Sequence, residues 1–117
     1  MLRALAAVVA VLLLALGGAR AQPVFRITYD VDRSDSTRVH INGRVFNDAL
    51  QDALDVHVTV EALDGGGRVV SRGISFVALQ IPGRGSAPFA VAVPAVAGIA
   101  RFRVSVSSFR VGFGPQS

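Results

Sequence analysis

Apolar and polar residues alternate one by one along two stretches near the middle of the chain, residues 37–46 and 54–62. In the first stretch the apolar row is Val39, Ile41, Gly43 and Val45. In the second stretch the apolar row is Leu54, Val56, Val58, Val60 and Ala62. Successive side chains of a β-strand point to opposite faces, so each stretch predicts a strand with one buried and one solvent-facing side.

A run of glycines follows the second of these strands. Asp64-Gly65-Gly66-Gly67 supplies the backbone freedom that short hairpin loops require, and it predicts a tight turn into a strand over residues 68–78. The alternation in that strand is uneven, and Gly73 lies in its middle. We therefore expect a β-bulge at Gly73.

Three more stretches predict strands. Residues 24–31 predict an edge strand, and residues 87–93 predict a strand with Phe89, Val91 and Val93 inward. The last strand begins near residue 99, with Phe102, Val104 and Val106 on its apolar side. Phe109 follows Phe102 by an odd number of positions, so either a bulge or turn lies at residues 107–108 or the tail forms a separate strand.

Short strands separated by Gly, Pro and Asp turns predict an all-β fold. We expect an immunoglobulin-like β-sandwich of six or seven mostly antiparallel strands, preceded by a signal peptide. The link over residues 47–53 is long enough to cross between sheets. Whether the strands at 37–46 and 54–62 pair or face each other across the core therefore stays open.

The N-terminus has the pattern of a secretory signal peptide. A basic start at Arg3 precedes an apolar run over residues 4–16, and small residues end at Ala19-Arg20-Ala21. The apolar run is shorter than the roughly 20 residues of a membrane span. We expect cleavage after Ala21, which leaves residues 22–117 as one domain. The alternative is a signal peptide that stays uncleaved, which would be the chain's single attachment to the membrane.

The amino-acid composition limits where the protein can be located and which reactions and ligands it can support. The chain has no cysteine, which removes disulfides, thiolate catalysis and a lipid-bearing cysteine, and favours the periplasm or a similarly sheltered location over extracellular fluid. Together with the signal peptide, the composition predicts a periplasmic or secreted bacterial protein. The net charge is +4, but Arg3 and Arg20 leave with the signal peptide. The nearly balanced domain that remains gives no reason to expect nucleic-acid binding.

Few residues form a pattern that carries chemistry. His40 and His57 lie on the polar rows of different strands without a third metal ligand at a recognisable spacing, so we expect no metal site and no cofactor. The aspartates near strand ends lack the calcium-loop spacing and are typical turn residues. Ser86 has surroundings faintly like those of a protease serine, but no G-x-S-x-G elbow exists and no base is indicated. We therefore predict that the protein is not an enzyme and has no catalytic residue.

The last strand carries the best candidate for a partner-binding surface. Its members are Arg101, Arg103, Phe109 and Arg110. Arginine beside exposed apolar side chains is common where proteins dock. The alternative is a solvated strand face on which the arginines mask a sheet edge.

Four segments together resemble the FxLYD-type bacterial domains. They are a G-x-V-x-N strand, a V-x-V-x-V strand, a D-x-x-G-x-V turn and a P-G segment followed by Phe. The matching residues are Gly43, Val45 and Asn47; Val56, Val58 and Val60; Asp64, Gly67 and Val69; and Pro82, Gly83 and Phe89. The resemblance implies an immunoglobulin-like sandwich of an exported protein, and it supplies no catalytic residue.

The expected function is that of a non-catalytic exported binding or assembly module of the bacterial cell envelope, whose partner is an unidentified envelope protein. One alternative is an accessory subunit that adds a partner strand to a sheet edge at residues 24–31 or 109–113. The other alternative, of a different class, is a small hydrolase.

Overall fold

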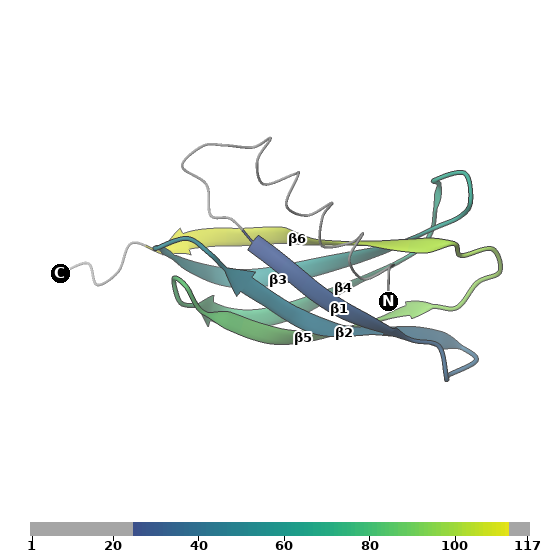
Figure 1. The fold of residues 1–117 in the computed structure, drawn as a ribbon, viewed down its shortest axis with the longest axis horizontal. Helices are drawn as coiled ribbons and strands as arrows, with labels where there is room; N and C mark the ends of the chain where they lie inside the picture. The colour runs from purple at the N-terminus through teal and green to yellow at the C-terminus, as the bar shows by residue number, and fades with distance from the viewer. Residues whose placement is uncertain (1–24, 113–117) are drawn as a thin grey trace.

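The computed structural model describes residues 25–112, which form six β-strands (Figure 1). The predicted signal peptide, its cleavage point and Phe113 lie outside the described residues. The strands are β1 (Phe25–Asp32), β2 (Arg38–Asn47), β3 (Asp52–Leu63), β4 (Val69–Ile81), β5 (Ser86–Pro94) and β6 (Arg101–Gly112). Among these residues no helix has the length and apolarity needed to cross a membrane.

The strands form two antiparallel sheets of three, in the orders β1-β2-β5 and β4-β3-β6. The two sheets face each other as a sandwich, which confirms the all-β prediction (Figure 1). The chain runs up and down through both sheets. The β1–β2, β3–β4 and β5–β6 connections therefore lie at one end of the sandwich, and the β2–β3 and β4–β5 connections lie at the other.

β2 and β3 belong to different sheets, which answers the question that the sequence left open. Their alternating rows meet across the core instead of side by side. The buried residues of the two central strands are Val39, Ile41 and Val45 on β2 and Val56, Val58 and Val60 on β3. β5 adds Phe89, Val91 and Val93, which confirms the inward row expected there. β1 is an edge strand, as its sequence predicted.

The prediction that Leu54 belongs to the buried row of β3 is wrong. Asp55 has a positive φ of 52°, and the pairing of β3 shifts at this point, so one strand face is interrupted by a bulge. The bulge places Ala53 and Val56 on the inner face, both fully buried. Leu54 is left half-buried. Aspartate is among the non-glycine residues that adopt positive φ most often, but the apolar alternation continues on both sides of Asp55 and hid the bulge.

The prediction of a bulge at Gly73 is also wrong. Gly73 is regularly paired with Val60, and the pairing of β4 shifts instead at Val70 and at Val77. Glycine has a different role at this position. A Cβ on Gly73 would lie 2.6 Å from the carbonyl oxygen of Ala92, so the absence of a side chain lets β4 approach the backbone of β5.

The β3–β4 hairpin forms at the glycine run, as predicted. The amide of Gly67 donates to the Asp64 carbonyl at 3.0 Å, and Gly67 has a φ of 87° that favours glycine. The carboxylate of Asp64 also accepts bonds from the amides of Gly66 and Arg68, both at 2.9 Å. Asp64 therefore fixes the loop by its backbone and its side chain together.

Asn47 is fully buried at the end of β2 and joins three separate segments. Its Nδ2 donates to the carbonyl oxygens of Gln51 at 2.9 Å, Ile81 at 3.1 Å and Pro82 at 3.3 Å. Its Oδ1 accepts a bond from the amide of Ala49 at 3.1 Å. The two connections at this end of the sandwich are therefore held to β2 by one side chain.

Candidate interaction surface

The outer face of the β4-β3-β6 sheet carries a row of ion pairs. Glu61 on β3 accepts from Arg103 on β6 at 2.7 Å and from Arg72 on β4 at 3.1 Å. Hydrogen bonding from Arg103 is the largest of the effects that hold the pKa of the Glu61 carboxyl below its ordinary value. Farther along the sheet, Arg110 pairs with Asp55 at 2.6 Å. Two of the three arginines in the predicted surface are therefore engaged within their own sheet.

Phe109 does not join these arginines. Its side chain is half-buried against the core and meets Phe25 of β1 edge to face, with ring centroids 5.0 Å apart. The cause is a shift in the pairing of β6, where Val106 pairs with Val58 and Ser108 with His57. Ser107 is thus the extra residue of a bulge, which confirms the first of the two alternatives for this segment.

The surface expected on β6 is therefore not assembled as one patch. Arg101, Arg103 and Arg110 are exposed, whereas Phe109 points away from them into the sandwich. The expectation that Phe109 lies exposed beside the arginines is wrong. The bulge at Ser107 turns Phe109 to the inner face of the sheet, whereas in a regular strand Phe109 would lie on the outer face.

A different exposed apolar surface lies on β4. Ile74, Phe76 and Leu79 have 62%, 49% and 73% of their surface exposed. The ring of His57 on the neighbouring strand meets Phe76 edge to face at 5.3 Å. We call Ile74, Phe76 and Leu79 the β4 apolar row. Sequence reasoning missed it because the uneven alternation of this strand hid which residues face outward.

Each of the four outermost strands of the sandwich has one edge without a backbone ladder, which we call its free edge. β4 nevertheless lies close to β5 at residues 71–73, where the Ser71 hydroxyl donates to the Pro94 carbonyl oxygen at 2.8 Å. Three of the four strands carry protection that discourages pairing. β1 and β6 carry several charged side chains, and β5 contains Pro88 and Pro94. Charges and prolines are the usual means by which edge strands avoid pairing with other chains. Between Gly73 and Ile81, β4 has neither a charged residue nor a proline. Its remaining protection is the pair of bulges at Val70 and Val77.

The two histidines are not brought together. His40 lies on β2 in one sheet, 3.3 Å from the carboxylate of Asp35. His57 lies on β3 in the other sheet, and its Nδ1 is 3.2 Å from the carbonyl oxygen of Asp55. Within residues 25–112, no three His, Cys, Asp or Glu side chains group closely enough to hold a metal ion.

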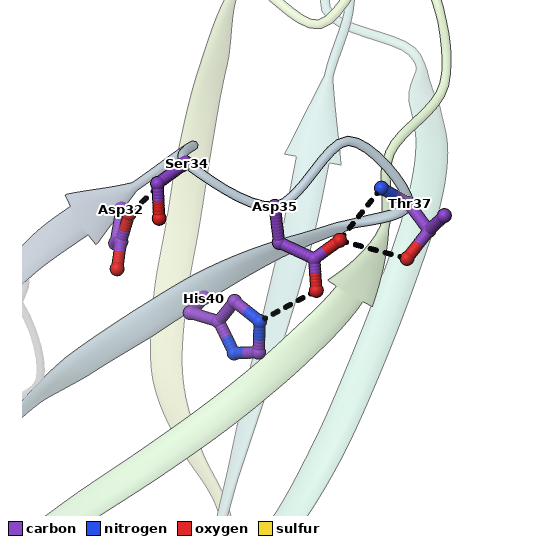
Figure 2. A network of polar contacts seen from close by, with 5 residues as sticks. All are labelled: Asp32, Ser34, Asp35, Thr37 and His40. Carbon is purple, nitrogen blue, oxygen red and sulfur yellow. Dashed lines mark hydrogen bonds and ion pairs between the residues drawn. The ribbon is translucent and has the colours of Figure 1, made fainter.

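The β1–β2 loop holds the polar network that Figure 2 draws. The Asp32 carboxylate accepts from the amide of Ser34 at 2.9 Å. The Asp35 carboxylate accepts from the amide and the hydroxyl of Thr37, each at 2.8 Å. Both carboxylates accept from the amide two residues later, which is the aspartate turn that Asp, Ser and Thr favour in loops. The network fixes a loop, because its donors are mainly groups of the loop itself.

The hydrogen bonds from Thr37 lower the pKa of Asp35 to about 2. Since this folded pKa lies below the ordinary value of 3.8, the carboxylate stabilises the fold above about pH 4 and loses that effect as the pH falls toward 2. We expect Asp35→Asn to lose less melting temperature than the natural protein between pH 4 and pH 2. Asp30→Asn, a change on the exposed face of the same hairpin, is the control. Equal acid sensitivity of Asp35→Asn and the natural protein would contradict this.

Ser86 was the serine with the most protease-like surroundings in the sequence. Its hydroxyl accepts a hydrogen bond from Arg44 of the adjacent strand at 2.8 Å. In the part of the chain that the structure describes, no hydrogen bond connects Ser86 to either histidine. The bond to Arg44 is a cross-strand contact of an exposed sheet face, and it provides no base to activate the hydroxyl.

Comparison with known proteins finds no family model, no curated protein and no solved structure that matches the chain. The resemblance to FxLYD-type domains stays a prediction. The geometry does bring two of its motif segments together, since Asn47 of the G-x-V-x-N strand binds the carbonyl oxygen of Pro82 in the P-G segment.

Proposed function

We propose that the protein is a non-catalytic binding or assembly module of the bacterial cell envelope, exported to the periplasm or secreted. In this proposal the sandwich is of the immunoglobulin-like kind, and residues 1–21 are its cleaved signal peptide. The buried residues are almost all apolar, and the two buried polar residues, Asn47 and Ser71, bind backbone carbonyl oxygens. The interior therefore serves stability, and recognition falls to the surface.

The observation that carries the proposal is the β4 apolar row beside a free strand edge. Large apolar side chains exposed side by side are costly to leave in water and are common in the centres of protein interfaces. Ile74 and Phe76 lie two positions apart on the outward face of one strand, so a single partner can contact both. The partner we propose is a protein, because an apolar row beside an unpaired strand edge fits a polypeptide strand, and neither residue offers a charge for phosphate or metal.

The manner of binding that fits this surface is strand addition, in which a partner strand pairs with a sheet edge. Strand addition was expected at β1 or at the end of β6. The charges spread along those two strands make β4 the better candidate, because residues 73–81 of β4 carry none. The small hydrolase is the less supported alternative, since Ser86 is bonded to Arg44.

Export and binding are testable in the same cells. We expect the intact mass of the exported protein to correspond to a chain that starts at Gln22, because small residues precede this position at 19 and 21. A photoreactive residue at position 76 is expected to cross-link to an envelope protein. The same residue at position 50 is the control, because Leu50 is 79% exposed but lies off the strand edge.

Two results would contradict the proposal. A full-length chain that stays in the membrane would remove the cleavage after Ala21. Equal cross-linking at positions 50 and 76, or none at either, would remove β4 as the binding surface.

A further inference from the structure

Charge is distributed unevenly along β4. Four arginines gather where the strand begins, which we call the arginine end: Arg68, Arg72, Arg101 and Arg103. Arg72 and Arg103 share the single carboxylate of Glu61. Within residues 25–112, no ion pair joins Arg68 or Arg101. The carboxylate of Asp64 in the adjoining turn accepts from the amide of Arg68, so four arginines stand against two carboxylates here. The arginine end therefore carries excess positive charge on an exposed surface.

A carboxylate adjoins the other end of the strand. Asp52 accepts a hydrogen bond from the side chain of Gln80 at 2.7 Å and another from the amide of Gly83 at 3.0 Å. No arginine of the described chain pairs with it. Arg84 also lies in this region, so the net charge at this end of β4 is close to zero. Asp52, however, is the charged group bonded to β4 itself.

We infer that a second copy of this chain is the partner of the β4 edge, paired antiparallel with β4 of the first copy about a two-fold axis near Ile74–Phe76. This inference rests on the proposed function and names the partner and the site. Two-fold pairing would join two three-stranded sheets into one of six strands, and it would bring the exposed apolar side chains of both copies together at the centre.

Charge complementarity favours a second copy of the chain as the partner of the β4 edge. If the axis lies anywhere from Ile74 to Phe76, antiparallel pairing places Gln80 of one copy opposite residues 68–72 of the other. Asp52 of each copy then faces the arginine end of its partner. The two arginine ends lie at opposite ends of the joined strands and do not repel each other. A parallel arrangement would bring the arginine ends together.

The bulges at Val70 and Val77 limit the length of the pairing. The regular part of β4 between them is residues 71–76, so the joined ribbon is short. An interface of this size belongs to the small, transient class, and we expect a dissociation constant on the order of micromolar. The dimer should therefore form and dissociate with concentration.

Sedimentation of the exported, naturally processed protein over a range of concentrations tests the inference. We expect a monomer–dimer equilibrium, and Phe76→Lys should weaken the dimer by about tenfold or more because charge at an edge opposes pairing. Ile74→Lys is the second variant, in case the first fails to fold. Leu50→Lys is the matched control, since it adds the same charge at another exposed leucine and should leave the equilibrium unchanged.

The absence of cysteine allows a direct test of the axis. Single variants Ile74→Cys, Ser75→Cys and Phe76→Cys place one thiol near the proposed two-fold, where it would meet its own copy. We expect at least one of them to form a disulfide-linked dimer under mild oxidation, and Leu50→Cys to form none. A fully monomeric protein without disulfides at positions 74–76 would overturn the inference.

The outcome separates this inference from the proposed function. Cross-linking of position 76 to a different envelope protein, by a chain that stays monomeric, would overturn the self-pairing and leave the binding function standing. A monomeric chain that cross-links to nothing at position 76 would remove both. A dimer that Phe76→Lys and Ile74→Lys leave unchanged would place the interface elsewhere and also overturn the inference.

Discussion

Asn47→Ala is expected to lower the free energy of unfolding by about 2 to 4 kcal/mol, because each buried polar group that loses its partner costs about 1 to 3 kcal/mol. The alanine would remove the donor shared by the carbonyl oxygens of Gln51, Ile81 and Pro82, and the acceptor of the Ala49 amide. The connections at 48–51 and 82–85 would lose their common attachment to β2. Chemical denaturation of the purified protein measures this change.

Two further variants show whether the hydrogen bonds are responsible. Asn47→Asp should be at least as destabilising as alanine, since a buried carboxylate would face carbonyl oxygens that need a donor. Asn42→Ala removes an exposed asparagine from the same strand and should cost less than about 0.5 kcal/mol. A loss from Asn47→Ala no larger than that from Asn42→Ala would show that the buried side chain does not hold the two connections.

Gly43→Ala is expected to destabilise the protein by about 3 kcal/mol, at the upper end of the usual cost of overpacking. A Cβ at this position would overlap the carbonyl oxygen of Thr28 and lie 2.8 Å from the Cα of Tyr29. Both obstacles are backbone atoms of β1, which cannot move aside as a flexible side chain can. We expect β1 to separate from β2, so its backbone amides should exchange faster than those of β5.

Gly65→Ala is the control for this substitution. A Cβ on Gly65 meets no atom within 4 Å, so the unfolding free energy should change by less than about 0.5 kcal/mol. If Gly43→Ala were as stable as Gly65→Ala, the close approach of β1 to β2 at this point would be wrong.

The regular parts of the fold could be predicted from the sequence because they follow a period of two. Val58 and Val60 on β3 and Val91 on β5 lie inward as their alternation predicted, and all three are buried. The Asp64–Gly67 turn was predictable because glycine and aspartate have a strong local preference for such loops. These features depend on neighbouring residues alone.

The irregular parts could not be placed in the same way. The bulges of β3 and β4 lie at Asp55, Val70 and Val77, and none of these residue types marks a bulge by itself. Gly73 has the residue type of a bulge position, but glycine is needed there because the carbonyl oxygen of Ala92 in the facing sheet leaves no room for a side chain. A contact between sheets has no local signature, because it depends on residues far away in the chain.

The candidate interaction surface lies on β4 and not, as the sequence predicted, on β6, again because contacts between distant residues decide which side chains are exposed. One extra residue, Ser107, turns Phe109 toward Phe25 and separates it from the arginines. The partners of Arg103 and Arg110 are Glu61 and Asp55 of β3, which lie 42 and 55 residues earlier in the chain, and the sequence did not predict these pairs. The exposure of Ile74 and Phe76 became visible only once the register of β4 was known.

Amide hydrogen exchange along the four free edges tests the role of β4 most directly. It would be measured on the dilute protein and again on its associated form, whether the partner is a second copy or the envelope protein captured at position 76. We expect residues 71–76 to gain protection on association, and the edges of β1, β5 and β6 to remain unchanged. Protection gained at β1 or β6 while β4 stays unprotected would contradict the assignment of binding to β4.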